Sequence, residues 1–168
     1  LKELQRNWIG RSEGMQVSFD VVDERGKKLT TADIFTTCVE TIYGITFMVM
    51  APEHALIHEL SDSIKNIDEV RAYQEQTAYR SEFDRISNQK DKTGCLLDGI
   101  YAVNPVNGKR VPIYIADFVL CGYGTGMVMA VPTHDQRDYD FAKEFNIPMI
   151  KVIENDRVDA AYEKADYL

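Results

Sequence analysis

One stretch of the chain constrains its fold more than any other: residues 122–138, which read Gly-Tyr-Gly-Thr-Gly-Met-Val-Met-Ala-Val-Pro-Thr-His-Asp-Gln-Arg-Asp. Its glycines predict a tight turn, because glycine accepts backbone angles that strain other residues. The apolar run at 127–131 then predicts a buried strand. Thr133 and Gln136 have the spacing of a capping box, which predicts a helix from about His134 to about Phe145. The stretch therefore predicts a turn, a core strand and a helix start in close succession.

Two sets of polar side chains can be considered together with this prediction. Asp135 and Asp138 fall in the first turn of the helix, where free backbone N–H groups and the helix dipole favour negative charge. Thr36, Thr37 and Thr41 form the second group, and taken alone they are ordinary strand residues, since β-branched side chains suit sheets. Taken together, three hydroxyls and the Asp138 carboxylate predict a polar pocket for a small cationic ligand.

The rest of the chain alternates short apolar segments with turn signals and does not repeat a strand–helix–strand unit. Asn107-Gly108 predicts a hairpin turn, because this pair tolerates positive φ. Strands are predicted at 15–22, 29–37, 45–51, 95–103, 111–120, 127–131 and 149–153, with helices at 52–60, 67–87 and 134–145. This order favours an α+β domain with a barrel-like core of mixed or antiparallel β-sheet and surrounding helices.

The 168 residues suit one domain of ordinary size. We expect that domain at 15–154, with residues 1–14 as an entry linker from the rest of a larger protein and residues 155–168 as an exit linker. No apolar run is long enough to span a membrane. Cys38, Cys95 and Cys121 form no CxxC pair, which indicates reduced thiols and a cytoplasmic setting.

The net charge of −8 argues against a free-standing nucleic-acid-binding protein, which usually presents a basic face. A domain that handles only the tip of a nucleic acid, while other domains hold the backbone, is compatible with this charge.

Other motif interpretations are weaker. The glycine turn departs from a dinucleotide-binding fingerprint, because Met127 stands where the third glycine belongs and a strand follows. His54 and His58 have a spacing that can bind zinc, but no third ligand is evident, so a surface or capping role is expected. His134 and Asp138 can ligate a metal in a small-molecule hydrolase, which remains an alternative. No nucleophile elbow is present, so water is the expected nucleophile of any hydrolase.

Three segments resemble the editing (connective polypeptide 1) domain of bacterial-type leucyl-tRNA synthetase. They are Asn-Trp-Ile-Gly-Arg-Ser-Glu-Gly at 7–14, the stretch at 36–54 that ends in Ala-Pro-Glu-His, and residues 124–142. They come in the family's order and span most of the chain, whereas the ATP-handling signatures of the synthetase are absent. The resemblance thus implies the editing insertion without the aminoacylating site.

The resemblance implies proofreading: hydrolysis of the ester bond of tRNA(Leu) mischarged with norvaline, isoleucine or methionine. A site for aliphatic side chains discriminates one methylene by only about 1–3 kcal/mol, so a second site is needed. The full-length enzyme would ligate leucine to tRNA(Leu) using ATP and magnesium, while this domain would use no cofactor and no metal. The implied partners are the tRNA(Leu) 3′ adenosine carrying a non-cognate amino acid and the rest of the synthetase chain, in a cytoplasmic monomer without membrane contact.

The family's catalytic roles transfer to four matching positions. Asp138 should pair with the α-ammonium group of the substrate, in a charge-assisted bond. Thr41 should be the sieve that excludes leucine, its side chain filling the space that the branched γ-carbon would need. Thr36 and Thr37 should hydrogen-bond the substrate or the attacking water.

The predicted substrate-binding residues are Met129, Val131, Tyr123, Arg137, Asp135 and His134. Met129 and Val131 alternate on one strand face and should line the side-chain pocket. Tyr123 and Arg137 should contact the terminal nucleotides, and Asp135 should brace the helix start.

The chain departs from the family at residues 36–41. Where the family reads Thr-Thr-Arg-Pro-Asp-Thr, this chain reads Thr-Thr-Cys-Val-Glu-Thr, so Cys38 replaces a guanidinium and Val39 releases a rigid φ. Loss of the arginine would weaken contact with the adenosine end or misplace the loop. The alternative function is therefore a degenerate, hydrolytically weak module that only binds the tRNA 3′ end.

Overall fold

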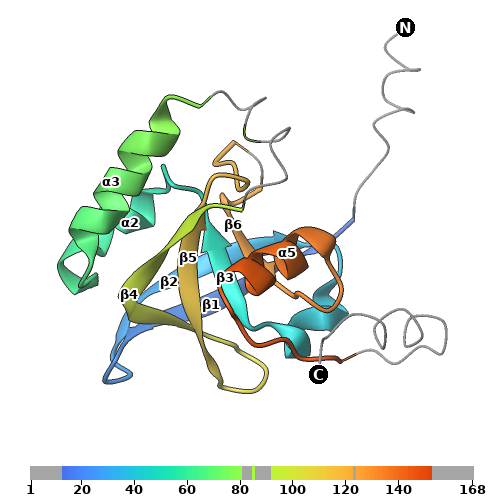
Figure 1. Cartoon of the computed structure of the whole chain (residues 1–168). Coiled ribbons are helices and arrows are strands. Elements are labelled where there is room, and N and C mark those ends of the chain that lie inside the picture. The colour runs from blue at the N-terminus through green and yellow to red at the C-terminus, as the bar shows by residue number, and fades with distance from the viewer. Residues whose placement is uncertain (1–12, 81–84, 86–91, 123, 153–168) are drawn as a thin grey trace, which may run out of the picture.

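The computed structural model describes residues 13–80, 85, 92–122 and 124–152. Its strands are β1 (Met15–Asp23), β2 (Lys28–Thr36), β3 (Phe47–Met50), β4 (Gly94–Val103), β5 (Arg110–Ala116) and β6 (Met127–Ala130). Its helices are the 3-10 helices η1 (Val39–Gly44) and η2 (Ser61–Ser63) and the α-helices α2 (Ala55–Glu59), α3 (Ile67–Ala78) and α5 (Gln136–Glu144). As Figure 1 shows, α2 and α3 lie on one side of the sheet and α5 lies on another.

The six strands form one sheet in the order β2-β1-β4-β5-β3-β6. The pairs are antiparallel except for β3 and β5, which run parallel. The two outermost strands, β2 and β6, also contact each other, so the sheet curves almost into a closed barrel. The predicted α+β class with a barrel-like mixed sheet is confirmed.

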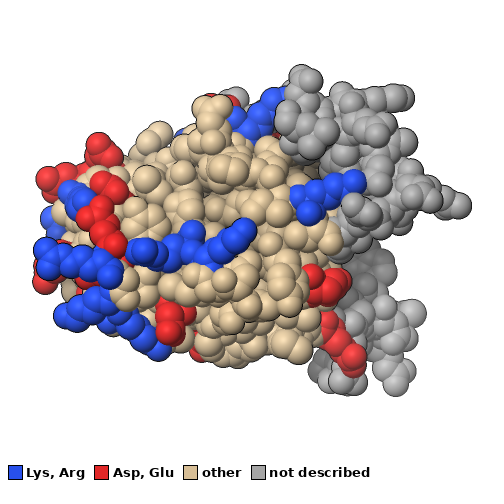
Figure 2. Space-filling view, turned by 90° about the horizontal axis from the view of Figure 1, so that it is seen from below, with Lys and Arg blue, Asp and Glu red and all other residues tan. Residues whose placement is uncertain are grey.

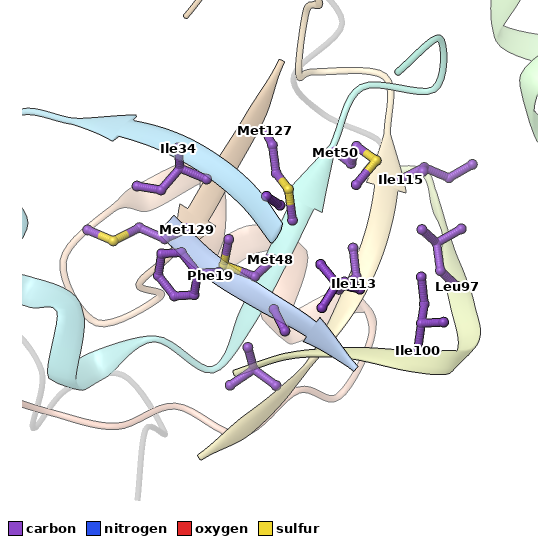
Figure 3. Close-up of a cluster of buried hydrophobic side chains, with 14 of the residues drawn as sticks. Phe19, Ile34, Met48, Met50, Leu97, Ile100, Ile113, Ile115, Met127 and Met129 are labelled. Atoms are coloured by element: carbon purple, nitrogen blue, oxygen red, sulfur yellow. The ribbon is translucent and has the colours of Figure 1, made fainter. Parts of the chain in front are cut away.

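The main core lies inside this curved sheet (Figure 3). Side chains from β1, β3 and β6 meet there, among them Phe19, Met48 and Met129. A second cluster joins α5 to the outer face of β3. Its rings include Phe47 and Phe141, whose centroids are 5.3 Å apart. Burial of each such ring contributes about 1.5–3 kcal/mol, which anchors α5 and therefore the first turn of that helix.

The predicted strand at 149–153 is wrong over the described residues, because no strand forms at 149–152. Pro148 has no N–H to donate to a ladder, and the carbonyl of Ile150 instead accepts a hydrogen bond from the Thr133 hydroxyl at 2.9 Å. Two other elements are shorter than predicted: β5 ends at Ala116 and α3 ends at Ala78. The predicted linkers at 1–12 and 155–168 lie outside the described residues.

The helix predicted to start at Pro52 begins at Ala55, and His54 is its N-cap. The His54 Nδ1 atom accepts a hydrogen bond from the Leu56 N–H at 3.2 Å, which confirms the expected capping role. Among the described residues, every helix is too short or too polar to cross a membrane.

Asn104 connects the β4–β5 hairpin to η1, the 3-10 helix that contains Thr41. Its side chain is buried, and its Nδ2 atom donates to the carbonyl of Ile42 at 2.7 Å. Its Oδ1 atom accepts from the Val106 N–H at 3.0 Å, so both ends of the amide are used. This single side chain thus fixes the turn and the neighbouring helix at once.

We expect Asn104→Ala to lower the free energy of unfolding by about 1–3 kcal/mol, because it leaves a buried carbonyl without its donor. Denaturant unfolding of this chain measures the change. Asn107→Ala is the matched control in the same turn, since Asn107 is exposed and its loss should cost no more than about 0.5–1 kcal/mol. Equal losses in the two variants would show that the Ile42 bond does not stabilise the fold.

Candidate functional site

The first turn of α5 is built differently from the predicted capping box. Asp135 is the N-cap, and its Oδ1 atom accepts hydrogen bonds from the N–H groups of Arg137 at 2.8 Å and Asp138 at 3.2 Å. The predicted capping by Thr133 with Gln136 is wrong, because Asp135 is the N-cap of α5, and the Thr133 hydroxyl donates to the carbonyl of Ile150. An aspartate is at least as good a cap as threonine, so the local competition favours Asp135.

Asp138 lies three residues after this cap and is 8% exposed. Its Oδ2 atom accepts a hydrogen bond from the Val131 N–H at 2.9 Å. Burial, and then the nearby charge of Asp135, raise the pKa of Asp138 from 3.8 to about 7, against the opposing effect of the Val131 bond. A carboxylate in the first turn of a helix is usually solvated, whereas Asp138 is a buried group that α5 packs against the end of β6.

The threonines are organised around the backbone of Cys38. The Thr36 Oγ1 atom accepts a hydrogen bond from the Cys38 N–H at 3.1 Å. The Thr41 hydroxyl donates to the Cys38 carbonyl at 2.8 Å, and Thr41 itself is buried. Thr37 is exposed, and its hydroxyl lies 3.8 Å from the Cys38 sulfur. The turn at 36–41 is thus held from both sides by its own hydroxyl groups.

The two elements that carry the polar groups, η1 and the start of α5, both contact Val131. Gly44, the last residue of η1, packs so closely that an added Cβ would lie 3.1 Å from a methyl carbon of Val131. The N–H of Val131 is the group that binds Asp138, and the carbonyl of Ala130 just before it accepts from the Thr46 N–H at 3.3 Å. The 3-10 helix that contains Thr41 and the helix start that contains Asp138 therefore pack against the same strand end.

Met129 and Val131 point to the same face of the β6 segment, as the alternation predicts. Both are buried in the main core cluster, where Met129 lies close to Phe19 in Figure 3. Arg137 is exposed and forms a loose ion pair with Asp135 at 3.6 Å. Their predicted contacts with a substrate stay predictions.

His134 lies in the sequence between Val131 and Asp138. Its Nε2 atom is buried and has no hydrogen-bond partner within the described residues. Burial lowers the pKa of His134, which favours the neutral ring. Tyr123 lies outside the described residues. In the part of the chain that the structure describes, no three His, Cys, Asp or Glu side chains are grouped to hold a metal ion.

A groove of about 340 Å³ lies between the β4–β5 hairpin and the segment that follows α5. Thr46 and Arg110 are among its lining residues, but none of the nine predicted site residues that the structure describes lines it. This groove is therefore not the site predicted from the sequence, and the predicted chemistry stays a prediction.

Sequence reasoning missed three features of the site. They are the backbone N–H of Val131, the close approach of Gly44 and the anchoring of η1 by Asn104. The first two are backbone features that no side-chain pattern predicts. Asn104 carries only a weak signal. An asparagine that precedes proline indicates a turn and is usually exposed, so the sequence does not indicate that this one is buried.

The chain resembles known proteins along nearly all of its length. Residues 6–167 match the family model described as leucyl-tRNA synthetase, editing domain. A leucine–tRNA ligase of Alkaliphilus oremlandii (strain OhILAs) is 48% identical over 161 residues, which cover 96% of this chain and 20% of that protein.

A solved structure has the same fold. It is a crystal structure of the ternary complex of Agrobacterium radiobacter K84 agnB2 LeuRS, tRNA and LeuAMS, with a TM-score of 0.69 and 33% identity. The match covers 97% of this chain and 19% of that one, so the chain spans about a fifth of the length of these relatives. With a family model that matches from residue 6 to residue 167, this chain belongs to the family of leucyl-tRNA synthetase editing domains.

Proposed function

We propose that this domain performs post-transfer editing: it hydrolyses the ester that joins a wrong amino acid to the 3′ adenosine of tRNA(Leu). Norvaline, isoleucine and methionine are the proposed amino acids. The observation that carries the proposal is the packing of the Asp138 helix start and the Thr41 helix against Val131. A carboxylate and a hydroxyl-lined turn at one strand end are the groups that an aminoacyl ester requires.

Asp138 would bind the α-ammonium group. Its charge is opposed by burial and by Asp135, so its carboxylate is poorly compensated by the protein. A cationic ligand supplies the missing positive charge, because an opposite charge nearby favours the ionised form. Binding of the ammonium group would therefore lower the pKa of Asp138 and fix the substrate at the end of β6.

The threonine hydroxyls would divide their roles according to their bonds. The Thr36 oxygen accepts from the Cys38 N–H, so its own proton can be donated to the ester or to the attacking water. The Thr41 proton is already donated to the Cys38 carbonyl, which leaves its bulk as the feature that a substrate would meet. Water would attack the ester carbonyl, and catalysis would rest on holding water and ester together.

Contacts with the body of the tRNA would come mainly from the rest of the synthetase. Figure 2 shows one face of the domain, where Lys and Arg side chains gather at one end together with Asp and Glu. Lys28 and Lys65 are paired with Asp20 and Glu24 at 2.6 Å and 2.5 Å. Phosphate groups are bound by unpaired cations, whereas Lys28 and Lys65 are already paired with carboxylates.

The test is deacylation of isoleucyl-tRNA(Leu) and norvalyl-tRNA(Leu) by the synthetase that contains this domain. We expect hydrolysis of both well above the rate without enzyme, while leucyl-tRNA(Leu) is spared. The matched control is the same synthetase with Asp138→Asn, which should be inactive in deacylation and unchanged in aminoacylation.

The alternative is a degenerate module that binds the tRNA 3′ end without hydrolysing it. Cys38 motivates it, because this exposed thiol stands where the family has an arginine. Hydrolysis no faster than in the Asp138→Asn enzyme, with tRNA binding retained, would establish the alternative and exclude editing.

A further inference from the structure

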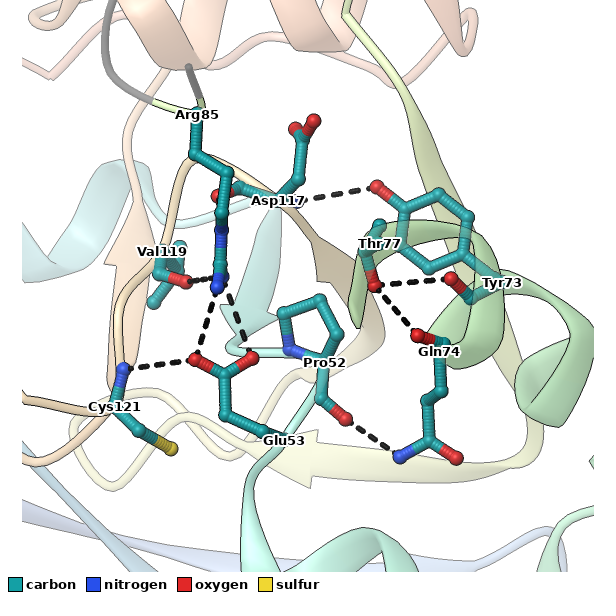
Figure 4. Close-up of polar contacts among 9 residues, drawn as sticks. All are labelled: Pro52, Glu53, Tyr73, Gln74, Thr77, Arg85, Asp117, Val119 and Cys121. Carbon is teal, nitrogen blue, oxygen red and sulfur yellow. Dashed lines mark hydrogen bonds and ion pairs between the residues drawn. The ribbon is translucent and has the colours of Figure 1, made fainter. Parts of the chain in front are cut away.

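Arg85 is a buried cation that bonds to two backbone carbonyls of one loop and to the carboxylate of Glu53. It is 9% exposed, and its Nε atom donates to the carbonyl of Asp117 at 2.6 Å. One Nη atom donates to the carbonyl of Val119 at 2.7 Å, and the two Nη atoms reach the carboxylate of Glu53 at 3.1 Å and 3.4 Å (Figure 4). A buried guanidinium needs such complete pairing, so the loop and Arg85 hold each other in place.

Glu53 continues this contact along the loop. Besides Arg85, its carboxylate meets the Cys121 N–H at 3.5 Å. Burial opposes ionisation of Glu53, but the Arg85 hydrogen bond and the other bonds outweigh it and hold the pKa of Glu53 below its usual value. The carboxylate is therefore charged at neutral pH and acts as a fixed acceptor for both Arg85 and the loop backbone.

The returning arm of the same loop is held by the residues that flank Glu53. The Ala51 N–H donates to the carbonyl of Gly126 at 2.9 Å, and the His54 Nε2 atom lies 3.1 Å from the Thr125 carbonyl oxygen. Gly126 has φ +72, and an added Cβ would lie 3.0 Å from the His54 ring. Residues 51–54 thus contact both arms of the loop that joins β5 to β6, which we call the β5–β6 loop (residues 117–126, described except at 123).

We propose that Arg85 and Glu53 are positioning residues that fix the β5–β6 loop for binding of the tRNA 3′ end. The loop leads into β6 at Met127, and the Val131 N–H just past the other end of this short strand binds Asp138. The placement of the loop would therefore help to set where the terminal nucleotides meet the ester site. This inference rests on the proposed editing function. It assigns the two residues to substrate binding and not to the hydrolytic step, because neither touches the groups at the end of β6.

The test uses the synthetase that contains this domain, with Arg85→Met as the main variant. The first readout is the alkylation rate of Cys121, followed by mass spectrometry of its peptide. Burial and the charge of Glu53 raise the pKa of this thiol, and Arg85 lowers it. Loss of the Arg85 charge alone would therefore slow alkylation of this exposed thiol, so the faster alkylation that we expect reports release of the loop.

The second readout is the kinetics of deacylation of isoleucyl-tRNA(Leu). We expect KM to rise about tenfold and kcat to stay within about threefold, because the loop would position the bound end and not the reacting water. Glu53→Gln should reproduce the rise in KM, and its half-exposed side chain makes it the safer variant for folding. Arg85→Lys should not restore KM, since an ammonium group cannot reach two carbonyls and a carboxylate in one plane.

Arg110→Met is the matched control. Arg110 donates to a backbone carbonyl as Arg85 does, but to that of Glu24 at 2.9 Å, so both readouts should stay at the wild-type value. Unchanged alkylation in Arg85→Met would overturn the proposal. Faster alkylation with unchanged KM would also contradict the proposal, because Arg85 would then have only a structural role. A loss confined to kcat would contradict it as well, because the loop would then act in the chemical step.

Failure of the editing function is distinguishable from failure of this inference. If the wild-type synthetase does not deacylate, binding of uncharged tRNA(Leu) replaces KM as the affinity readout. The alkylation of Cys121 and the tRNA dissociation constants then decide the role of Arg85 on their own: faster alkylation with about tenfold weaker binding supports it, and wild-type binding overturns it.

Discussion

Asp138→Asn is expected to lower kcat/KM for deacylation of mischarged tRNA(Leu) by about two to four orders of magnitude. The amide keeps an acceptor for the Val131 N–H and occupies nearly the same volume, so the strand end should stay in place. What is lost is the negative charge opposite the substrate ammonium group, and breaking a buried ion pair from one side costs about 3–5 kcal/mol. Asparagine is a sharper test than alanine, which would leave the buried N–H without a partner.

The same substitution should change how stability depends on pH. The folded state raises the pKa of Asp138 from 3.8 to about 7, so the folded chain binds this proton more tightly than the unfolded chain. The stabilising contribution is therefore complete below about pH 4 and is lost as the pH rises through about 7. The loss amounts to at most about 4 kcal/mol, and unfolding curves of Asp138→Asn at pH 4.5 and pH 8 should lack it.

Asp140→Asn is the control for both measurements. Asp140 lies on the same helix, and its carboxylate accepts a hydrogen bond from the Gln136 side chain at 2.8 Å near the surface. Deacylation and the pH dependence should both stay close to wild type in this variant. A wild-type kcat/KM in Asp138→Asn would remove Asp138 from the site, whatever its effect on stability.

Thr41→Ala is expected to make the synthetase deacylate correctly charged leucyl-tRNA(Leu), about 10- to 200-fold faster than wild type. Thr41 is buried and its proton is donated to the Cys38 carbonyl, so the side chain is held in one orientation. A pocket of fixed shape discriminates one methylene by about 1–3 kcal/mol, and removal of the γ-methyl and hydroxyl groups opens room of that order. Hydrolysis of isoleucyl-tRNA(Leu) should persist.

Thr41→Val separates bulk from hydrogen bonding. Valine has nearly the same shape as threonine but cannot donate to Cys38, so protection of leucyl-tRNA(Leu) should survive if the sieve is steric. If both Thr41→Val and Thr41→Ala hydrolyse leucyl-tRNA(Leu), the discrimination depends on the turn that the Thr41 hydroxyl holds in place. Full protection in the alanine variant would remove Thr41 as the sieve.

Local patterns predicted the architecture well and the burial of the site poorly. The hairpins, the apolar β6 segment and the helix after it are encoded in contiguous residues, so the α+β barrel-like sheet was predictable. The cap at Asp135 was missed because Thr133 satisfies the same spacing rule, and only the distant carbonyl of Ile150 decides between them. The strand at 149–153 failed for the same reason, because its partners depend on the path of the chain in space.

The burial of Asp138 could not have been predicted from its position on a helix. A carboxylate in a first turn is usually solvated, and here the rings of Phe141 and Phe47 hold α5 against the sheet so that Asp138 faces Val131. Arg85 gave no signal at all in the sequence. Its partners are two backbone carbonyls and Glu53, all more than thirty positions away. Glu53 lies in the Ala-Pro-Glu-His segment, but nothing in that segment indicates a contact with Arg85.

The turn at 36–41 depends on the backbone of Cys38 and not on its side chain. Thr36 and Thr41 contact its N–H and its carbonyl, groups that every residue except proline carries alike. Substitution of the Cys38 side chain can therefore alter what this position offers to a nucleotide while both backbone bonds of the turn are kept.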